Sequence, residues 1–263
     1  MKRKKILRIA LSAVFAIAIA VSLFQIIKIY IEDRESAELN NSLVSEVVVL
    51  NTKAPSDSTN KTPQTEDAPP LDENQVPIYV DFNALFSKNE DIIAWVYCPN
   101  TPINYPIVKG EDNDYYLRRL LDGTKNIAGT LFADFKNSAD FSDHNTIIYG
   151  HNMRNDTMFG TLPDYAKQKY YNAHPVWYLL TPEANYKVEL VAGFITPDDS
   201  EIYRITEDRK AIDAQVAIAI KKSKFKSGVT IESTDKLVTF STCTYEYKNA
   251  RFVLIGVLRE LEE

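Results

Sequence analysis

Residues 237–243 read Leu-Val-Thr-Phe-Ser-Thr-Cys, and their β-branched and aromatic side chains favour a β-strand that ends at Cys243. Eight positions later Arg251 begins a second strand-like run, and far upstream His151 follows a third such run at 145–150. A thiol, a guanidinium and an imidazole at strand ends suit acyl transfer through a thioester. These three side chains are therefore the candidate catalytic groups.

The chain around this stretch contains further strand candidates. They combine β-branched and aromatic residues and are separated by turn residues such as Asp122-Gly123. Several short strands at this spacing predict a mostly β fold that closes into a barrel of about eight strands. The predicted strands are residues 92–97, 104–108, 129–134, 145–149, 176–181, 186–195, 237–242 and 252–258.

Helical patterns are fewer. Residues 81–88 begin with Asp81 as a potential cap, and residues 162–171 predict a turn or two of helix. The clearest helix is 211–222, which has an Ala-rich apolar stripe and basic residues at its C-terminal end, where the helix dipole favours them. It lies between two predicted strands, inside a long insertion at 196–232.

The N-terminus predicts a membrane anchor. Basic residues at 2–5 precede an apolar run at 9–27, and roughly 20 residues of helix span the hydrocarbon core of a bilayer. Acidic residues follow the run, so the positive-inside rule places the N-terminus in the cytoplasm and the rest outside the cell membrane. A cleaved signal peptide is the alternative, but bulky residues at 24–29 continue the run. We predict that residues 1–31 are a basic stub and a single-pass signal-anchor.

A composition shift follows the anchor. Residues 32–75 are rich in Ser, Thr, Asn, Asp, Glu and Pro, which predicts a flexible extracellular linker. Residues 45–50, Ser-Glu-Val-Val-Val-Leu, are the exception and fit a short helix, a short strand or an apolar patch beside the membrane. Residues 76–263 then form one catalytic domain.

Composition also argues against some classes of function. The formal net charge of −6 argues against a nucleic-acid partner, which favours a basic face. The histidines and cysteines lack the spacings typical of metal sites, and no glycine-rich phosphate loop is present. We therefore expect no metal and no cofactor.

The two cysteines have two interpretations. A disulfide between Cys98 and Cys243 is possible in an extracellular domain. Alternatively, Cys98 follows a strand as a small hydrophobic residue, while Cys243 lies among hydroxyl side chains near Arg251, which suits a reactive thiol. Among the three histidines, His144 and His174 lie in loops, and only His151 directly follows a buried-looking strand.

Several motifs, taken in order, resemble those of the sortases. Residues 239–243, Thr-Phe-Ser-Thr-Cys, followed by Arg251, resemble the active-site signature of that family, usually Thr-Leu-x-Thr-Cys with a downstream Arg. Phe240 replaces the usual Leu and keeps its hydrophobicity. Residues 148–153, Ile-Tyr-Gly-His-Asn-Met, resemble the histidine segment. Segments 103–108, 112–117 and 158–160 resemble the class B branch specifically.

The resemblance to class B sortases covers essentially all of 76–263. It implies a closed barrel with an N-terminal helix and a long helix inserted between the two strands before the catalytic cysteine, which fit 81–88 and 211–222. It also implies that Cys243 attacks a backbone carbonyl in a C-terminal sorting signal of a secreted protein. His151 then acts as general acid and base, and Arg251 stabilises the oxyanion or orients the substrate.

The implied partners are sorting-signal peptides and an amine of a peptidoglycan precursor, which resolves the Cys243 thioacyl intermediate at the outer face of the membrane. Three alternatives stay open: a Cys–His hydrolase that uses water as acceptor, a sortase that polymerises pilins, and a disulfide-bonded binding module without activity. The resemblance places five residues in the peptide groove, namely Asn104, Val108, Ser241, Thr242 and Tyr203.

Overall fold

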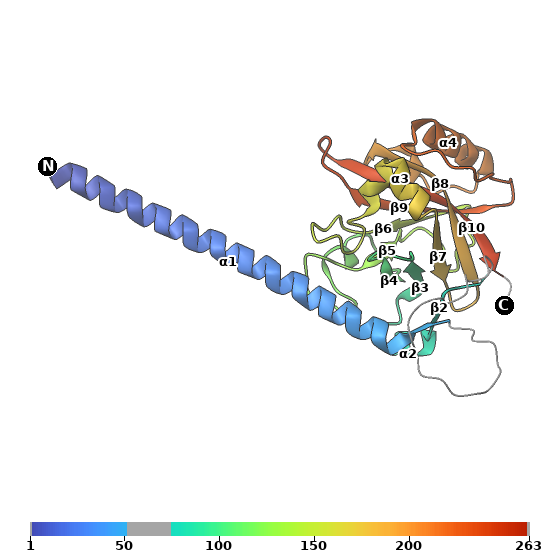
Figure 1. Cartoon of the computed structure of the whole chain (residues 1–263), viewed down its shortest axis with the longest axis horizontal. Helices are drawn as coiled ribbons and strands as arrows, with labels where there is room; N and C mark the ends of the chain where they lie inside the picture. Colours follow the sequence, from blue (N-terminus) through green and yellow to red (C-terminus); the bar gives the residue numbers. More distant parts are fainter. Residues whose placement is uncertain (1, 52–74, 262–263) are drawn as a thin grey trace, which may run out of the picture.

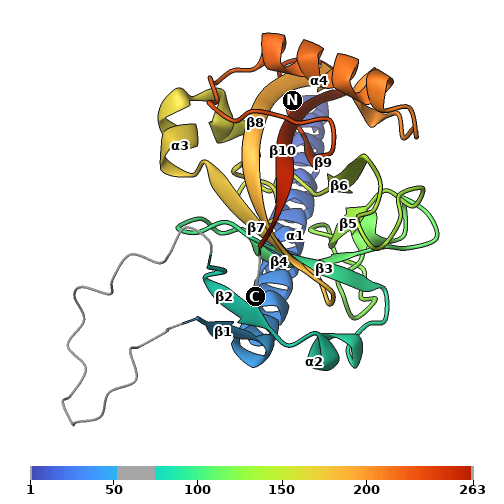
Figure 2. The same ribbon diagram turned by 90° about the vertical axis from the view of Figure 1, so that its right-hand side faces the viewer.

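The computed structural model describes residues 2–51 and 75–261 and, within the first range, side chains from Leu11 onward. Eight strands close into a barrel in the order β10-β8-β7-β3-β4-β5-β6-β9 (Figure 2). The predicted mostly β barrel is confirmed. The strands are β3 (Ile92–Tyr97), β4 (Asn104–Val108), β5 (Leu131–Ala133), β6 (Asn145–Tyr149), β7 (Val176–Leu180), β8 (Asn185–Pro197), β9 (Lys236–Cys243) and β10 (Ala250–Leu261).

The longest strands extend beyond the predicted segments. β8 and β10 pair antiparallel over their whole lengths, from Ala250 opposite Pro197 to Leu261 opposite Asn185. This pairing satisfies the backbone groups of residues whose side chains alone gave no strand signal. Parallel pairing occurs at two places, between β4 and β5 and between β6 and β9.

Helices lie outside the barrel. The predicted helix at 162–171 is broken, because Lys167 is extended and separates a 3-10 helix, η2 (Leu162–Ala166), from α3 (Gln168–Ala173). α4 (Arg209–Lys222) begins earlier than predicted because the side chain of Asp208 caps it. It lies between β8 and β9 in the chain, as expected. The other short helices are α2 (Phe82–Phe86), capped by Asp81, η1 (Tyr116–Arg118) and η3 (Glu201–Tyr203).

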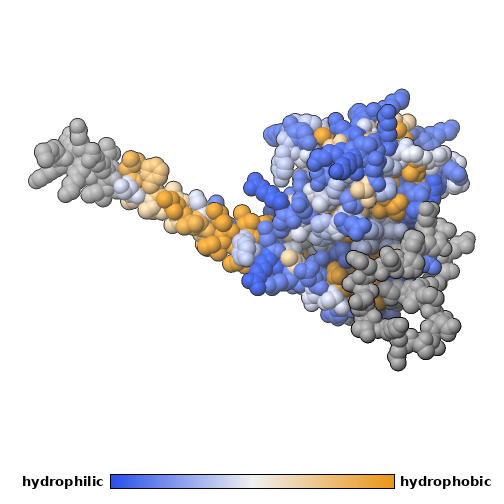
Figure 3. Space-filling model, viewed as in Figure 1, coloured by the Kyte–Doolittle hydropathy of each residue, from blue (hydrophilic) through white to orange (hydrophobic). Residues whose placement is uncertain are grey.

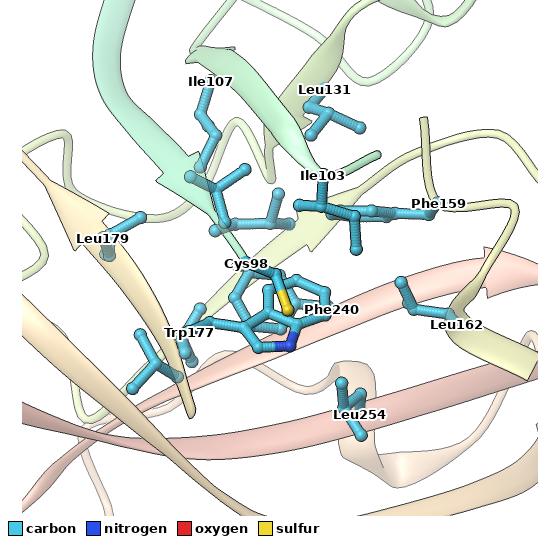
Figure 4. Close-up of a cluster of buried hydrophobic side chains, with 14 of the residues drawn as sticks. Cys98, Ile103, Ile107, Leu131, Phe159, Leu162, Trp177, Leu179, Phe240 and Leu254 are labelled. Atoms are coloured by element: carbon cyan, nitrogen blue, oxygen red, sulfur yellow. The ribbon is translucent and has the colours of Figure 1, made fainter. Parts of the chain in front are cut away.

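The barrel wall has a buried inner face and a covered outer face. Side chains of β9 alternate, so Val238 and Phe240 lie in the interior cluster while Leu237 lies in an outer cluster with α4. Figure 4 shows the interior, where Phe240 and Trp177 pack with ring centroids 4.5 Å apart. Because this register fixes which side chains face outward, it also sets the face on which Cys243 lies.

The N-terminal helix α1 (Lys2–Val47) extends far from the barrel and ends against it (Figure 1). Its large apolar side chains are exposed as far as Ile31. Among the described residues, α1 is the one helix long and apolar enough to cross a membrane. At its other end Leu43 and Val47 are buried in an outer cluster with Trp95.

The predicted flexible linker is wrong over residues 32–51. Helix α1 continues to Val47, and β1 (Val48–Leu50) pairs antiparallel with β2 (Ile78–Val80). Leu43 and Val47 are four residues apart and share one helix face. Polar residues on the other faces dominate the average composition of the segment, which is why the composition predicted a linker. The remaining part of the predicted linker, residues 52–74, lies outside the described residues. The folded domain thus includes residues before 76.

The packing of α1 against the barrel predicts that two nearby valines contribute differently to the free energy of unfolding. Val47→Ala should lower the free energy of unfolding by about 1.5–3 kcal/mol, because it removes buried methyl groups and leaves a cavity. Val47 is 1% exposed, whereas Val49, two residues later, is 61% exposed. Val49→Ala is therefore the matched control and should change stability little. Denaturant unfolding of both variants checks this, and equal effects would contradict the packing of α1 on the barrel.

Candidate active site

Cys243 and Arg251 lie directly opposite each other on neighbouring strands. β9 and β10 pair antiparallel, and the Cα atoms of these two residues are partners in the register. Directly opposed residues place their Cβ atoms roughly 5 Å apart on one face of a sheet. Phe252, the next residue of β10, fills the barrel interior, so Arg251 faces outward. The thiol and the guanidinium therefore share the outer face of the barrel.

His151 is brought to this face because β6 runs parallel to β9. Tyr149 is the partner of Ser241, and the Gly150 N–H donates to the Ser241 carbonyl at 3.1 Å. On either side of His151, the Thr242 hydroxyl donates to the Gly150 carbonyl and the Asn152 amide donates to the Cys243 carbonyl, each at 2.8 Å. These hydrogen bonds hold the histidine segment alongside the strand that ends in Cys243.

Gly150 is required for this close approach. A Cβ atom at this position would collide with the side chains of Leu131 and Phe159. A larger residue here would require either these two side chains or the histidine segment to shift. The glycine beside His151 thus has a steric role in placing the imidazole.

The three candidate catalytic residues line one cleft of about 260 Å³. One side of the cleft comes from the chain around η1 and the opposite side from the start of the insertion between β8 and β9. The residues that line it are Asn113, Leu117, Phe132, Tyr149, Gly150, His151, Asp198, Tyr203, Ser241, Thr242, Cys243 and Arg251.

The imidazole of His151 is partly buried and hydrogen-bonded. Its Nε2 lies 2.7 Å from the Leu117 carbonyl, which accepts, so the Nε2–H tautomer is assigned and Nδ1 is left as the basic nitrogen. Burial lowers the pKa of His151 below its ordinary value of 6.5, the Leu117 hydrogen bond opposes this shift, and the charge of Arg118 adds to it. At neutral pH the ring is therefore predominantly neutral and able to accept a proton.

Arg251 is held loosely. One guanidinium nitrogen lies 3.4 Å from a carboxylate oxygen of Asp198, and another donates to the Ala250 carbonyl at 3.1 Å. A partly exposed ion pair of this length contributes little to stability. Asp198 orients the guanidinium of Arg251 without holding it tightly. A bound peptide can therefore compete for the N–H donors of Arg251.

Tyr203 brings the insertion to β9, the strand that ends in Cys243. Its hydroxyl lies 2.8 Å from the Ser241 hydroxyl, and its ring stacks on Tyr149 with centroids 6.2 Å apart. Burial raises the pKa of Tyr203 to about 12. The tyrosine therefore stays neutral and keeps a hydrogen-bonding hydroxyl at the wall of the cleft.

Comparison with known proteins places this site in a family, because residues 96–259 match the family described as "Sortase domain". The chain belongs to the sortase family. Sortase B of Listeria monocytogenes is 37% identical over 174 residues, covering 65% of this chain and 70% of that protein. Sortase B of Staphylococcus aureus is 26% identical over 259 residues, covering 97% and 98%. The solved Staphylococcus aureus sortase B–substrate complex matches with a TM-score of 0.65 at 28% identity, covering 69% and 85%.

This sortase is of class B, and sortases are cysteine transpeptidases, so the enzyme class expected from the sequence is confirmed. The predicted groove residues Ser241, Thr242 and Tyr203 all line the cleft. Ser241 and Thr242 reach the cleft because β9 pairs with β6, and Tyr203 reaches it because the insertion folds back onto β9. Their part in binding a peptide stays a prediction.

Asn104 and Val108 are not brought to the cleft of this sortase. The side-chain oxygen of Asn104 accepts a hydrogen bond from the Trp95 indole at 2.7 Å, and its carbonyl accepts from Asn40 of α1. Val108 is fully buried in the outer cluster that also contains Leu43 of α1. The backbone of Asn104 and the side chain of Val108 thus lie on the part of the barrel that α1 covers, a partner that the local sequence does not indicate.

The sequence reasoning did not select several residues that line the cleft. Asp198 lies in the insertion at 196–232, and Asn113 and Leu117 belong to the segment 112–117 that resembles class B sortases. Tyr149 was read as part of a strand. A signal was therefore present for most of them, but nothing in the sequence showed that their side chains meet.

The two cysteines are free, so the disulfide interpretation is wrong. Cys98 lies in the barrel interior, with its sulfur 4.0 Å from the Tyr165 hydroxyl, whereas Cys243 lies on the outer face. Burial raises the pKa of Cys98 to about 11, which leaves its thiol protonated and unreactive. Cys243 is the partly exposed thiol of this sortase. The described residues contain no group of three or more ligands suited to a metal ion.

Arg251→Lys should lower kcat/KM by about 10²-fold, since a point charge on a flexible chain replaces a planar fork of donors. Arg259→Lys is the matched control, because Arg259 lies on the same strand and pairs with Glu189 far from the cleft. It should affect stability more than turnover. Steady-state kinetics with a peptide substrate checks both variants, and equal loss of activity would contradict a role for Arg251 in catalysis.

Proposed function

We propose that this sortase is a membrane-anchored transpeptidase that cleaves a C-terminal sorting signal of secreted proteins and joins them to a peptidoglycan amine. The observation that carries the proposal is the convergence of Cys243, His151 and Arg251 on one cleft. Each residue supplies one group that two successive acyl transfers require: a nucleophile, a proton carrier and a fixed positive charge.

The first acyl transfer forms a thioester. Neutral His151 takes the proton of the Cys243 thiol as the sulfur attacks a backbone carbonyl of the sorting signal. The carbonyl oxygen becomes an oxyanion, which Arg251 stabilises because its charge is fixed at any relevant pH. When this intermediate collapses, the C–N bond breaks and protonated His151 gives its proton to the leaving amine.

The second acyl transfer reverses these roles. The acceptor amine attacks the thioester carbonyl and loses a proton to His151, and the new oxyanion again lies beside Arg251. Collapse breaks the C–S bond, and the departing sulfur of Cys243 recovers the proton from His151. The enzyme returns to its starting state, and the secreted protein is joined to the acceptor by an amide bond.

Two solved sortase B structures, the first of them from Staphylococcus aureus, support the choice of substrates. One is a complex with its substrate, and another is a complex with triglycine. Triglycine carries a free α-amino group, so it is chemically an amine acceptor. We transfer both properties to this chain, whose cleft has room for a peptide segment beside the thiol.

The apolar helix α1 supports a position at the membrane. Its exposed apolar side chains run as far as Ile31, and a bilayer is the environment that would bury them. Basic residues precede the apolar run, so the N-terminus would be cytoplasmic and the barrel extracellular. Secreted protein substrates and cell-wall precursors are both available on that side.

The test uses the full chain in neutral detergent, since α1 contributes to the folded domain. The protein is incubated with a library of fluorogenic sorting-signal peptides, with and without triglycine, and mass spectrometry follows Cys243. We expect an acyl adduct on Cys243 and a peptide–triglycine product. Adduct formation that yields only free acid, at any amine concentration, would identify a Cys–His hydrolase. Absence of any adduct would reject the proposal.

The pH dependence follows from His151. Acylation needs the neutral ring, and burial lowers the pKa of His151 below 6.5, so protonation removes activity only at lower pH. The acid limb of kcat/KM should therefore have its midpoint below 6.5. Initial rates across a series of buffers of constant ionic strength check this. A midpoint at or above neutral pH would contradict the assigned environment of His151.

A further inference from the structure

A second cleft lies where α1 meets the barrel. It measures about 570 Å³, more than twice the volume of the cleft that contains Cys243, and it contains none of the three proposed catalytic residues. Two of its residues come from α1 and the others from the chain around and after η1. They are Lys28, Glu32, Asp114, Leu117, Arg118, Arg119, Lys125, Asn126 and Ile127.

The lining of this second cleft carries more positive than negative charge. Four of its residues are cationic and two are acidic, and Lys28 already pairs with Glu32 at 3.5 Å. Arg119 lies over the ring of Tyr115, 4.4 Å from its centroid. Within the described residues, no carboxylate lies within 4.0 Å of the charged groups of Arg118, Arg119 or Lys125. These three cations are thus available to an anionic ligand.

The cleft lies at the end of the apolar part of α1. Exposed apolar side chains cover this helix up to Ile31, and Figure 3 shows this hydrophobic stretch outside the barrel. The Asn126 amide donates to the Glu32 carbonyl at 2.8 Å. The barrel therefore begins to contact the helix within one turn of the apolar segment. Because Leu43 and Val47 fix the far end of this helix to the barrel, the cleft is held at the level of the lipid headgroups.

The second cleft also adjoins the catalytic cleft. Leu117 lines both of them, and its carbonyl accepts the hydrogen bond from His151. Arg118, the next residue, is close enough to lower the pKa of His151. A ligand bound among these cations would therefore lie beside the proton carrier of the proposed reaction.

We propose that this basic cleft binds the phosphate groups of a membrane lipid. Arginine and lysine recognise phosphate by charge and by multiple N–H donors, and basic residues at the bilayer surface attract anionic headgroups. Two lipids share this chemistry: the anionic phospholipids of the bilayer and a polyprenyl diphosphate that carries the acceptor amine. The second source rests on the proposed function, and binding there would bring the acceptor to Cys243 from the membrane side.

The test measures the reactivity of Lys125 in the full chain, reconstituted in nanodiscs of phosphatidylcholine alone, with phosphatidylglycerol or with undecaprenyl diphosphate. The rate of Lys125 acetylation, measured by mass spectrometry, should fall by about fivefold or more when the phosphate ligand is present. Lys221 and Lys222, exposed at the end of α4, are internal controls whose rates should not change.

The pattern of protection identifies the source. Protection of Lys125 by both anionic lipids would show general headgroup binding, and protection by the diphosphate alone would identify the carrier lipid. Equal acetylation in all three discs would overturn the proposal. Arg118→Gln should reduce the protection at least about threefold, since one of the cations is removed, while Lys221→Gln should leave it intact. Full protection in Arg118→Gln would also overturn it.

The same discs separate this proposal from the proposed function. A sorting-signal peptide is added, and the Cys243 adduct is measured beside Lys125 acetylation. An adduct without protection would leave the transpeptidase standing and reject the lipid site. Protection without an adduct would support the lipid site and reject the transpeptidase.

Discussion

Cys243→Ala should abolish the acyl adduct and lower kcat/KM for transpeptidation by more than about 10⁴-fold, because no other group can form the thioester. Cys243 is the partly exposed cysteine, and it lies opposite Arg251 in the cleft. Mass spectrometry of the intact protein and product analysis by chromatography measure both effects. Activity within an order of magnitude of the wild type would reject the nucleophile.

Cys98→Ala is the matched control for this prediction. The same substitution is made at a thiol that is fully buried and whose pKa is raised to about 11. It should retain the Cys243 adduct and near wild-type kcat, with some loss of thermal stability from the small cavity left beside Tyr165. Loss of activity in a folded Cys98→Ala protein would assign this thiol a second role.

His151→Ala should slow both half-reactions, each by about 10²–10⁴-fold, the usual effect of losing a general acid or base. Both half-reactions slow because the same imidazole gives a proton to the leaving amine in the first and takes a proton from the acceptor amine in the second. Single-turnover acylation and amine-dependent release of the adduct, measured separately, check this. Slow acylation with unchanged release would show that the proton carrier acts in only one step.

His144→Ala is the control for His151. His144 precedes β6 and His151 follows it, so the two imidazoles lie at opposite ends of one strand. Of these two histidines, only His151 lines the cleft that contains Cys243. His144→Ala should therefore keep both rates near those of the wild type, and a comparable loss would indicate that damage to β6, rather than a missing proton carrier, explains the His151 result.

The strands of the barrel were predictable because their signal is local. Residues 92–97, 104–108 and 145–149 have the bounds of β3, β4 and β6, since β-branched and aromatic side chains alternate within them and turn residues flank them. The helix 162–171 was predicted as continuous but is broken at Lys167. Its interruption depends on how η2 and α3 pack on the barrel, which composition does not record.

The N-terminal segment shows the limit of composition. Residues 32–51 average to a polar, linker-like sequence, yet they form a helix and a strand whose apolar side chains Leu43 and Val47 complete an outer cluster of the barrel. One of the residues against which Leu43 and Val47 pack is Trp95, which lies about fifty residues further along the chain. A local window cannot contain both halves of such an interface.

By itself, the sequence determined the strands of the barrel, the apolar N-terminal helix and the three chemical groups proposed for catalysis, because each of these is a property of neighbouring residues. Only the tertiary structure decided that Cys243 faces Arg251, that the β6–β9 pairing carries His151 to them, and that Asn104 and Val108 lie away from the cleft. These decisions depend on strand register and on contacts between distant segments, and shifting a strand by one residue would exchange every side chain between its two faces.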